Sequence, residues 1–235
     1  MCNYVFEHCP LQVKILTTND VRTRFEIYMQ KTSIGTLYVF SAPSGAGKTT
    51  LVKALLEQTD KIGVSVSHTT RAPRAGEINS KDYNFVTQEG FKNLIEQNAF
   101  LEHAQVFDNF YGTSKMWVEQ ELDAGRDVIL EIDWQGAQQI SQQMPDMVSV
   151  FILPPSRAEL LKRLTGRGTD EQDIIDRRMQ DAMGEMSHYG EFDYLIVNDD
   201  FDTALQELRA IVLARRQRTA VQSQKQPQLL KNLLN

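Results

Sequence analysis

Cysteine, histidine and long apolar runs are all scarce in this chain of 235 residues. Its two cysteines, Cys2 and Cys9, form neither a Cys-x-x-Cys pair nor a disulfide framework, which favours a reducing, cytoplasmic setting. Its four histidines show no metal-ligand spacing, which argues against a zinc site. The longest apolar run, Ala210 to Ala214, is far short of the roughly 20 residues that span a bilayer, so we expect no membrane partner.

Basic residues are outnumbered by acidic ones. The chain has 25 Lys and Arg against 31 Asp and Glu, a formal net charge of −6. Binding to the phosphate backbone of nucleic acids needs a surplus of Lys and Arg on one face, so we expect no nucleic-acid partner. A hydrophobic share of 41% and a charged share of 24% exclude disordered and low-complexity classes. Any phosphate site must therefore be a local cluster.

The two ends of the chain differ in composition from its middle. Residues 1–28 balance three basic with three acidic side chains and lack an apolar segment, which fits neither a signal nor a transit peptide. We therefore treat residues 1–35 as an extension, expect the folded unit to begin near residues 29–36, and hypothesise that translation starts at Met29. Residues 214–235 contain no acid and are rich in glutamine, and we expect there a helix end that frays into solvent.

Strand-like and helix-like segments alternate through residues 36–213, which predicts an α/β fold with a parallel-sheet core. Two helix boundaries are marked: Ser156 with Glu159 forms a capping-box pattern, and Gly125 ends the helix-like run from Ser114. The predicted strands are 36–42, 62–66, 83–86, 100–107, 127–132, 148–153 and 194–198.

A phosphate-binding loop follows the first predicted strand. The stretch from Ala42 to Thr49 matches the P-loop pattern, except that Ala42 replaces the usual first glycine. Small residues let backbone N–H groups surround a phosphate, and the following helix adds the positive end of its dipole. We expect Lys48 to reach the β and γ phosphates and Thr49 to offer its hydroxyl to the Mg²⁺ that accompanies ATP. The predicted ATP-binding residues here are Ala42, Pro43, Ser44, Gly45, Ala46, Gly47, Lys48, Thr49 and Thr50.

Two acids end the strand predicted at 127–132. Glu131 and Asp133 are two positions apart, so they share a face at the carboxyl end of the strand, where open α/β sheets bind ligands. Acids at a strand end are often only a solvated edge. Beside a P-loop they are candidates to hold a metal or to bind a polar ligand, and we assign Asp133 to the Mg²⁺ site together with Thr49.

The segment after the second predicted strand carries two arginines three positions apart. Pro73 biases the backbone before it toward extended geometry, and Arg71 and Arg74 could then surround one anionic group. Alone, such a pair is usually a solvated basic loop. In context, the pattern Ser-x-Thr-Thr-Arg-x-Pro-Arg-x-Gly-Glu at residues 67–77, followed by Lys-Asp-Tyr-x-Phe at 81–85, resembles the signature of the bacterial guanylate kinases.

This resemblance extends from Thr36 to about Leu213. It implies the P-loop nucleoside monophosphate kinase fold, with a GMP-binding lobe at about residues 67–125 and an arginine-bearing lid at about 156–187, in a domain spanning 36–213. It also implies the reaction ATP + GMP = ADP + GDP, with dGMP as a further acceptor. The oligomeric state stays open, and a homo-oligomer is compatible with it.

The resemblance also implies roles for individual residues. Glu102 would bind guanine, because one carboxylate can accept from both N1–H and the exocyclic amine. The arginines Arg163, Arg167 and Arg178 would close over the phosphates and, with Lys48, neutralise charge on the transferred group. Asn198 would lie near the adenine of ATP. The GMP phosphate would be held by Arg71, Arg74, Tyr83 and Tyr111, and the base pocket would be completed by Ser67, Thr113 and Glu131.

Two other functions are compatible with parts of the pattern. A scaffold module related to these kinases would bind peptides, but such modules typically have an eroded P-loop, whereas Lys48 is present here. A related kinase acting on a sugar phosphate such as ribose bisphosphate would need no group that binds a purine, so Glu102 and Ser67 distinguish that alternative.

Overall fold

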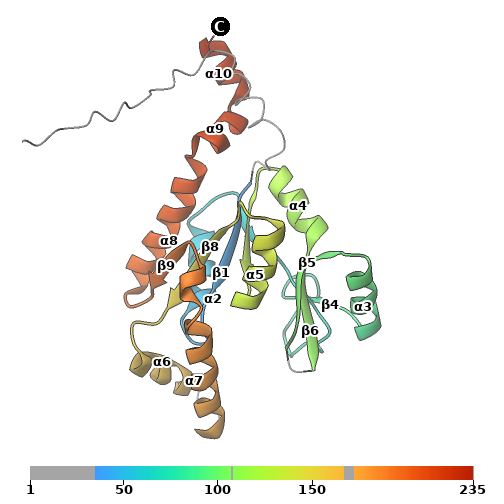
Figure 1. The fold of residues 1–235 in the computed structure, drawn as a ribbon, viewed down its shortest axis with the longest axis vertical. Coiled ribbons are helices and arrows are strands. Elements are labelled where there is room, and N and C mark those ends of the chain that lie inside the picture. Colours follow the sequence, from blue (N-terminus) through green and yellow to red (C-terminus); the bar gives the residue numbers. More distant parts are fainter. Residues whose placement is uncertain (1–34, 107, 167–171, 235) are drawn as a thin grey trace, which may run out of the picture. The chain divides into compact units, whose positions relative to one another are not determined.

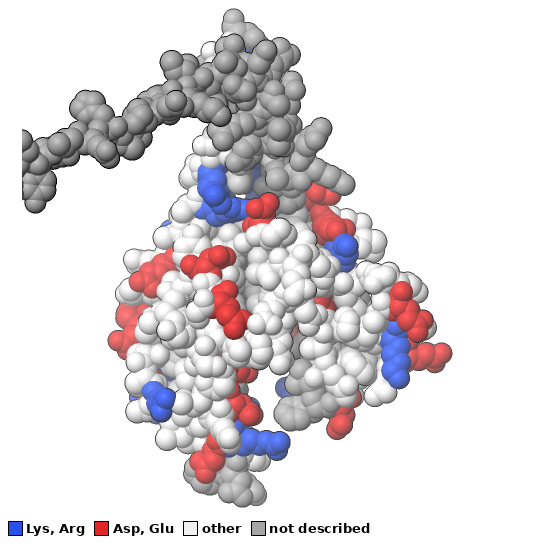
Figure 2. Space-filling view, viewed as in Figure 1, with Lys and Arg blue, Asp and Glu red and all other residues white. Residues whose placement is uncertain are grey.

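The computed structural model describes residues 35–106, 108–166 and 172–234, all within one compact unit, Ser33–Asn235. The predictions made for residues 1–34, including a start at Met29, lie outside the described residues. No helix in the described part of the chain is long and apolar enough to cross a membrane. On the face in Figure 2, basic and acidic side chains are interspersed.

Five parallel strands form the central sheet, in the order β2-β7-β1-β8-β9. All five residues of the central strand β1 are buried, as expected for a parallel sheet that is covered on both faces. This sheet confirms the predicted core. The strands are β1 (Leu37–Ser41), β2 (Ile62–Val64), β7 (Asp127–Glu131), β8 (Val148–Leu153) and β9 (Tyr194–Val197).

Successive side chains of β1 point to opposite faces of the sheet, and the hydrophobic core accordingly has two layers. Tyr38 and Phe40 pack with residues of α2 (Lys48–Glu57) and α8 (Phe201–Arg216) on one face of the sheet. Leu37 and Val39 pack with residues of α4 (Lys115–Asp123) and α5 (Trp134–Gln143) on the other face. Figure 1 shows α8 and α5 on opposite sides of β1. Because β1 is the middle strand, the loop that joins its C-terminal end to α2 lies at the centre of the carboxyl edge of the sheet.

A second sheet, in the order β4-β3-β6-β5, forms a separate lobe with α3 (Gln88–Glu96). Its strands are β3 (His68–Thr69), β4 (Asn84–Phe85), β5 (Phe100–Val106) and β6 (Asn109–Ser114). Sequence patterns missed β3 and β6. The first is only two residues long, and the second, Asn-Phe-Tyr-Gly-Thr-Ser, lacks apolar alternation and is defined by its antiparallel pairing to both β3 and β5.

The predicted helix boundaries agree with the structure. The Ser114 hydroxyl accepts the backbone N–H of Trp117 at the start of α4, and Gly125 beyond its end has a φ of +76°. The Ser156 hydroxyl caps α6 (Arg157–Thr165) by accepting the N–H of Glu159 at 3.1 Å. Between α6 and β9 lie α7 (Gln172–Met186) and the short 3-10 helix η1 (Tyr189–Glu191).

The C-terminal segment corrects an expectation. We expected residues 214–235 to fray into solvent, but α8 ends at Arg216 and two further helices follow, α9 (Thr219–Lys225) and α10 (Pro227–Leu234). The glutamines supply hydrogen bonds that favour these helices: Gln222 donates to the carbonyl of Arg216 at 2.8 Å and receives a bond from Gln226 at 2.6 Å.

Candidate active site

The loop between β1 and α2 has the backbone geometry of a phosphate cradle. Gly45 and Gly47 adopt φ values of +92° and +95°, in the left-handed region where glycine is favoured. The N–H of Ala46 donates to the carbonyl of Pro43 at 3.1 Å, and α2 begins directly after Gly47. The loop therefore opens onto a helix N-terminus, an arrangement that attracts anions.

Lys48 lies at the first position of α2, among three carboxylates. Burial lowers the pKa of its ammonium group, and the negative charges of Glu131, Asp133 and Glu185 act in the opposite direction. Carboxylates on β7, on the segment after it and on α7 therefore all act on this one ammonium group. Lys48 thus offers a positive charge where a nucleotide phosphate would enter the cradle.

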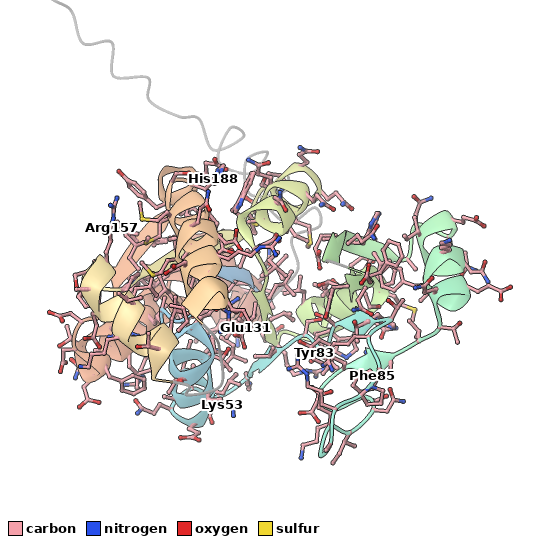
Figure 3. All side chains as sticks on the ribbon, turned by 90° about the horizontal axis from the view of Figure 1, so that it is seen from below. Lys53, Tyr83, Phe85, Glu131, Arg157 and His188 are labelled. Carbon is pink, nitrogen blue, oxygen red and sulfur yellow. The ribbon has the colours of Figure 1, made fainter. Side chains whose placement is uncertain are left out.

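The two acids after β7 have different partners. Glu131 accepts a hydrogen bond from the Thr49 hydroxyl at 2.9 Å, so its carboxylate lies beside the P-loop. Asp133 caps α5 by accepting the N–H of Gly136 at 2.8 Å. Thr50 follows in the first turn of α2 and is exposed. Figure 3 shows Glu131 on the core, with Tyr83 and Phe85 on the neighbouring lobe.

Glu185 belongs to this site, although no sequence motif pointed to it. Its carboxylate accepts a hydrogen bond from the backbone N–H of Ser44 in the P-loop and lies close enough to Lys48 for their charges to interact. Burial raises its pKa, and Oε2 is buried without a hydrogen-bond partner among the described residues. α7 packs against α6, and this tertiary arrangement brings Glu185 to a loop some 140 positions earlier in the chain.

Glu102 and Thr113 form a buried polar pair in the lobe. They are register partners on β5 and β6, and the Thr113 hydroxyl donates to Glu102 Oε1 at 2.6 Å. The Glu102 residue is only 6% exposed, and burial raises its pKa from 4.5 to about 7 against the opposing effect of the Thr113 bond. The charge of Asp133 raises this pKa further, so the lobe and the core contribute to one electrostatic site.

A cluster of aromatic rings surrounds Arg71 in the same lobe. Its guanidinium carbon lies 5.3 Å from the centre of the Tyr83 ring, and its side chain also hydrogen-bonds Tyr111. The Tyr83 and Tyr111 rings are 6.1 Å apart in an edge-on arrangement. These three predicted residues therefore lie together. The side chain of Arg74 is exposed on the adjoining loop.

Glu77 organises that loop and was not assigned a role from the sequence. It accepts from Arg71 Nη2 at 2.7 and 3.0 Å and from the backbone N–H of Arg74 at 2.7 Å. Its hydrogen bond and its charge both raise the pKa of Arg71. The last predicted GMP residue, Ser67, lies just before β3 and accepts the N–H of Asn84 through its carbonyl at 2.9 Å.

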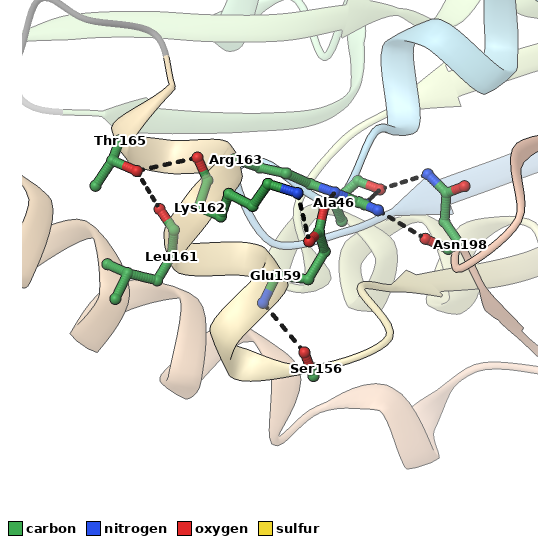
Figure 4. A network of polar contacts seen from close by, with 8 residues as sticks. All are labelled: Ala46, Ser156, Glu159, Leu161, Lys162, Arg163, Thr165 and Asn198. Carbon is green, nitrogen blue, oxygen red and sulfur yellow. Dashed lines mark hydrogen bonds and ion pairs between the residues drawn. The ribbon is translucent and has the colours of Figure 1, made fainter.

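The predicted lid arginines have different surroundings. Arg163 on α6 donates to the carboxylate of Glu159 and to two backbone carbonyls, those of Ala46 and Asn198, as Figure 4 shows. Arg178 is partly buried on α7. Arg167 lies outside the described residues.

Comparisons with known proteins identify the family. The family model described as guanylate kinase matches residues 34–215. The chain belongs to the guanylate kinase family. A guanylate kinase from Saccharophagus degradans is 61% identical over 204 residues, which cover 87% of this chain and 100% of that relative. One from Alkalilimnicola ehrlichii is 58% identical over 200 residues, 85% of this chain and 98% of the relative.

A solved structure gives the same result for the fold. The crystal structure of guanylate kinase from Anaplasma phagocytophilum matches with a TM-score of 0.66 and 38% identity, covering 80% of this chain and 90% of that one. The family resemblance and the P-loop nucleoside monophosphate kinase fold predicted from the sequence are therefore confirmed. As a guanylate kinase family member, the chain has the enzyme class of a nucleoside monophosphate kinase.

Proposed function

We propose that the described site binds ATP in the P-loop and GMP in the lobe, and transfers the γ-phosphoryl group between them. The reaction is the phosphorylation of GMP to GDP at the expense of ATP, as expected for a member of this family. The observation that best supports the assignment is the buried pair of Glu102 and Thr113, at 2.6 Å, in the lobe facing the P-loop site. A P-loop alone would identify a nucleotide site without identifying the acceptor.

Glu102 selects guanine by hydrogen-bond complementarity. Guanine presents N1–H and an exocyclic amine side by side, and one ionised carboxylate accepts from both. Adenine presents an acceptor at N1, which would face the same oxygens and leave a buried charge without a donor. Thr113 holds the carboxylate in position, and Ser67, just before β3, is the proposed donor to guanine O6. The same contacts admit dGMP, which has the same base.

The phosphate of GMP binds at the aromatic cluster around Arg71. The guanidinium supplies positive charge and paired N–H donors, and Tyr83 and Tyr111 supply hydroxyl donors beside it. Arg74 joins them from the exposed loop that Glu77 holds. Transfer then requires the phosphate of GMP to be directed toward the P-loop, where ATP would bring its terminal phosphate.

Transfer proceeds by in-line attack of a GMP phosphate oxygen on the γ-phosphorus of ATP, while the bond from that phosphorus to the β–γ bridging oxygen breaks and ADP leaves with the electron pair. The attacking oxygen is already anionic, so no general base is needed, and positioning and charge stabilisation supply the rate. The backbone amides of residues 44–49 and the ammonium group of Lys48 hold the donor. Arg178, together with Arg167, approaches the transferred group when the lid closes and excludes water.

A magnesium ion fits the donors beside the P-loop. The Thr49 hydroxyl and the carboxylates of Glu131 and Asp133 are hard oxygen ligands of the kind that Mg²⁺ prefers. When bound with ATP at Thr49 and Asp133, the ion would neutralise charge on the β and γ phosphates. The domain limits of 36–213 and a cytoplasmic location remain predictions. So do the absence of nucleic-acid and membrane partners and the possibility of a homo-oligomer.

A coupled assay of ADP release with a panel of acceptors tests this function. GMP, dGMP, AMP, UMP and ribose bisphosphate are compared at equal concentration with saturating ATP and Mg²⁺. We expect GMP to have the highest kcat/KM, with dGMP next. A preference for ribose bisphosphate would instead identify a sugar phosphate kinase, and it would show that Glu102 does not select a purine.

A further inference from the structure

The carbonyl oxygen of Ala46, in the middle of the P-loop, is held from outside the cradle. Asn198, at the end of β9, donates to it from Nδ2 at 2.7 Å, and Arg163 donates to it from Nη1 at 3.4 Å. Figure 4 shows both donors converging on this one oxygen. Asn198 is buried, with 6% of its surface exposed, so its bond is shielded from water.

This carbonyl shares a peptide unit with the N–H of Gly47. A trans peptide is planar, so its C=O and N–H point in opposite directions. Fixing the Ala46 oxygen outward therefore directs the Gly47 N–H inward, toward the phosphates. Glycine at position 47 also makes the contact with Asn198 possible, because a Cβ there would lie 2.4 Å from Asn198 Nδ2.

Arg163 is itself held in place by three acceptors. Its Nε donates to Glu159 at 3.1 Å, and its Nη2 donates to the carbonyl of Asn198 at 3.1 Å, besides the contact with Ala46. Glu159 also binds Lys162 at 3.4 Å, but Lys162 is largely exposed. The guanidinium thus links α6, the end of β9 and the P-loop.

We propose that Asn198 and Arg163, with Glu159 behind Arg163, are positioning residues for the nucleotide phosphates. They orient the Ala46–Gly47 peptide so that its N–H is directed toward the triphosphate before the nucleotide arrives. This inference rests on the proposed function, because it takes the P-loop to be the ATP site. It differs from the roles implied by family resemblance, which place Asn198 beside the adenine and Arg163 over the phosphates.

A ligand without a base separates the two roles of Asn198. We would measure binding of Mg²⁺-tripolyphosphate and of Mg²⁺-ATP to the full chain by calorimetry, for the wild type and for Asn198→Leu, which removes the Nδ2 donor at similar side-chain size without adding a charge. The inference predicts that both affinities fall by the same factor, roughly tenfold, while GMP affinity is unchanged. Loss of ATP affinity alone would show an adenine contact and overturn the inference, as would no loss at all.

Glu159 provides a second test that does not depend on the folding of the Asn198 variant. Glu159→Gln weakens the hold on Arg163, and we expect a roughly threefold loss of affinity for both tripolyphosphate and ATP, with a raised KM for ATP and a nearly unchanged kcat. The matched control, Lys162→Met, removes the other partner of Glu159 and should bind as the wild type does. Equal binding by Glu159→Gln and the wild type would overturn the role of Arg163. Failure of the wild type to phosphorylate GMP would refute the proposed function separately, because tripolyphosphate binding needs no acceptor.

Discussion

The pKa of Glu102 makes both stability and GMP binding depend on pH. Burial raises this pKa from 4.5 to about 7, so between these values the folded chain holds a proton that the unfolded chain releases. The free energy of unfolding therefore falls as pH rises through this window. Each pKa unit corresponds to about 1.4 kcal/mol, so the ionised Glu102 costs about 3 kcal/mol at pH 8.

Replacing Glu102 by Gln removes this cost. Urea unfolding at pH 5 and pH 8 should show the variant close to the wild type at pH 5 and more stable by about 3 kcal/mol at pH 8, less any loss from an amide hydrogen left without a partner. The control is Glu119→Gln, an exposed acid on α4, which should alter neither value by more than about 0.5 kcal/mol.

GMP binding should have the opposite pH dependence. Guanine needs the ionised carboxylate, so the Kd for GMP should fall roughly tenfold from pH 6 to pH 8 as Glu102 loses its proton. The phosphate of GMP, with a second pKa near 6, adds only about twofold over this range. In Glu102→Gln the change in the Kd for GMP between pH 6 and pH 8 should shrink to the roughly twofold effect of the phosphate. Discrimination against AMP should weaken by about 1.5 to 3 kcal/mol. A wild-type Kd as flat with pH as that of the variant would refute the role of Glu102, and ATP binding measured in the same series is the internal control.

Three further substitutions test other parts of the structure. Lys48→Ala should abolish turnover while circular dichroism shows an intact fold, and retained turnover would place ATP elsewhere. Glu185→Gln keeps an acceptor for the Ser44 N–H but removes a negative charge that competes with the ATP phosphates for Lys48. The KM for ATP in steady-state kinetics should therefore fall by roughly two- to fivefold. An unchanged or higher KM would show that Glu185 does not compete with ATP. Asp127→Asn deprives Arg216 of a buried partner at 2.7 Å and should lower the free energy of unfolding in urea by about 3 kcal/mol. Its control, Glu121→Gln, affects a more exposed ion pair and should cost under about 1 kcal/mol. Equal losses would refute the larger effect of the buried pair.

The parallel core and the P-loop could be predicted because their signals are local. The β1 residues are all buried and, apart from Ser41, hydrophobic, and the loop after them needs its glycines at positions 45 and 47, where φ is positive. The antiparallel lobe gave weaker signals. β6 consists of residues with no apolar period, and it forms because β3 and β5 pair with its two edges.

The site shows the same division between local and tertiary information. The role predicted for Glu102 comes only from the family resemblance, whereas its pairing with Thr113 and its raised pKa follow from the register of β5 with β6 and from burial. Glu185 carries no motif, because its role depends on where α7 packs. For Arg163, the family resemblance implies a role over the phosphates, which stays a prediction. Its bonds to three protein acceptors depend on the tertiary structure, and no local pattern indicated them.

A crystal structure with GMP and a non-hydrolysable ATP analogue bound together would test most directly that two nucleotides meet between the P-loop and the lobe. We predict the guanine edge on Glu102, the GMP phosphate at Arg71 and Tyr111, and the triphosphate within the loop that ends at Lys48. A monophosphate bound away from Glu102, or a triphosphate outside that loop, would contradict this arrangement.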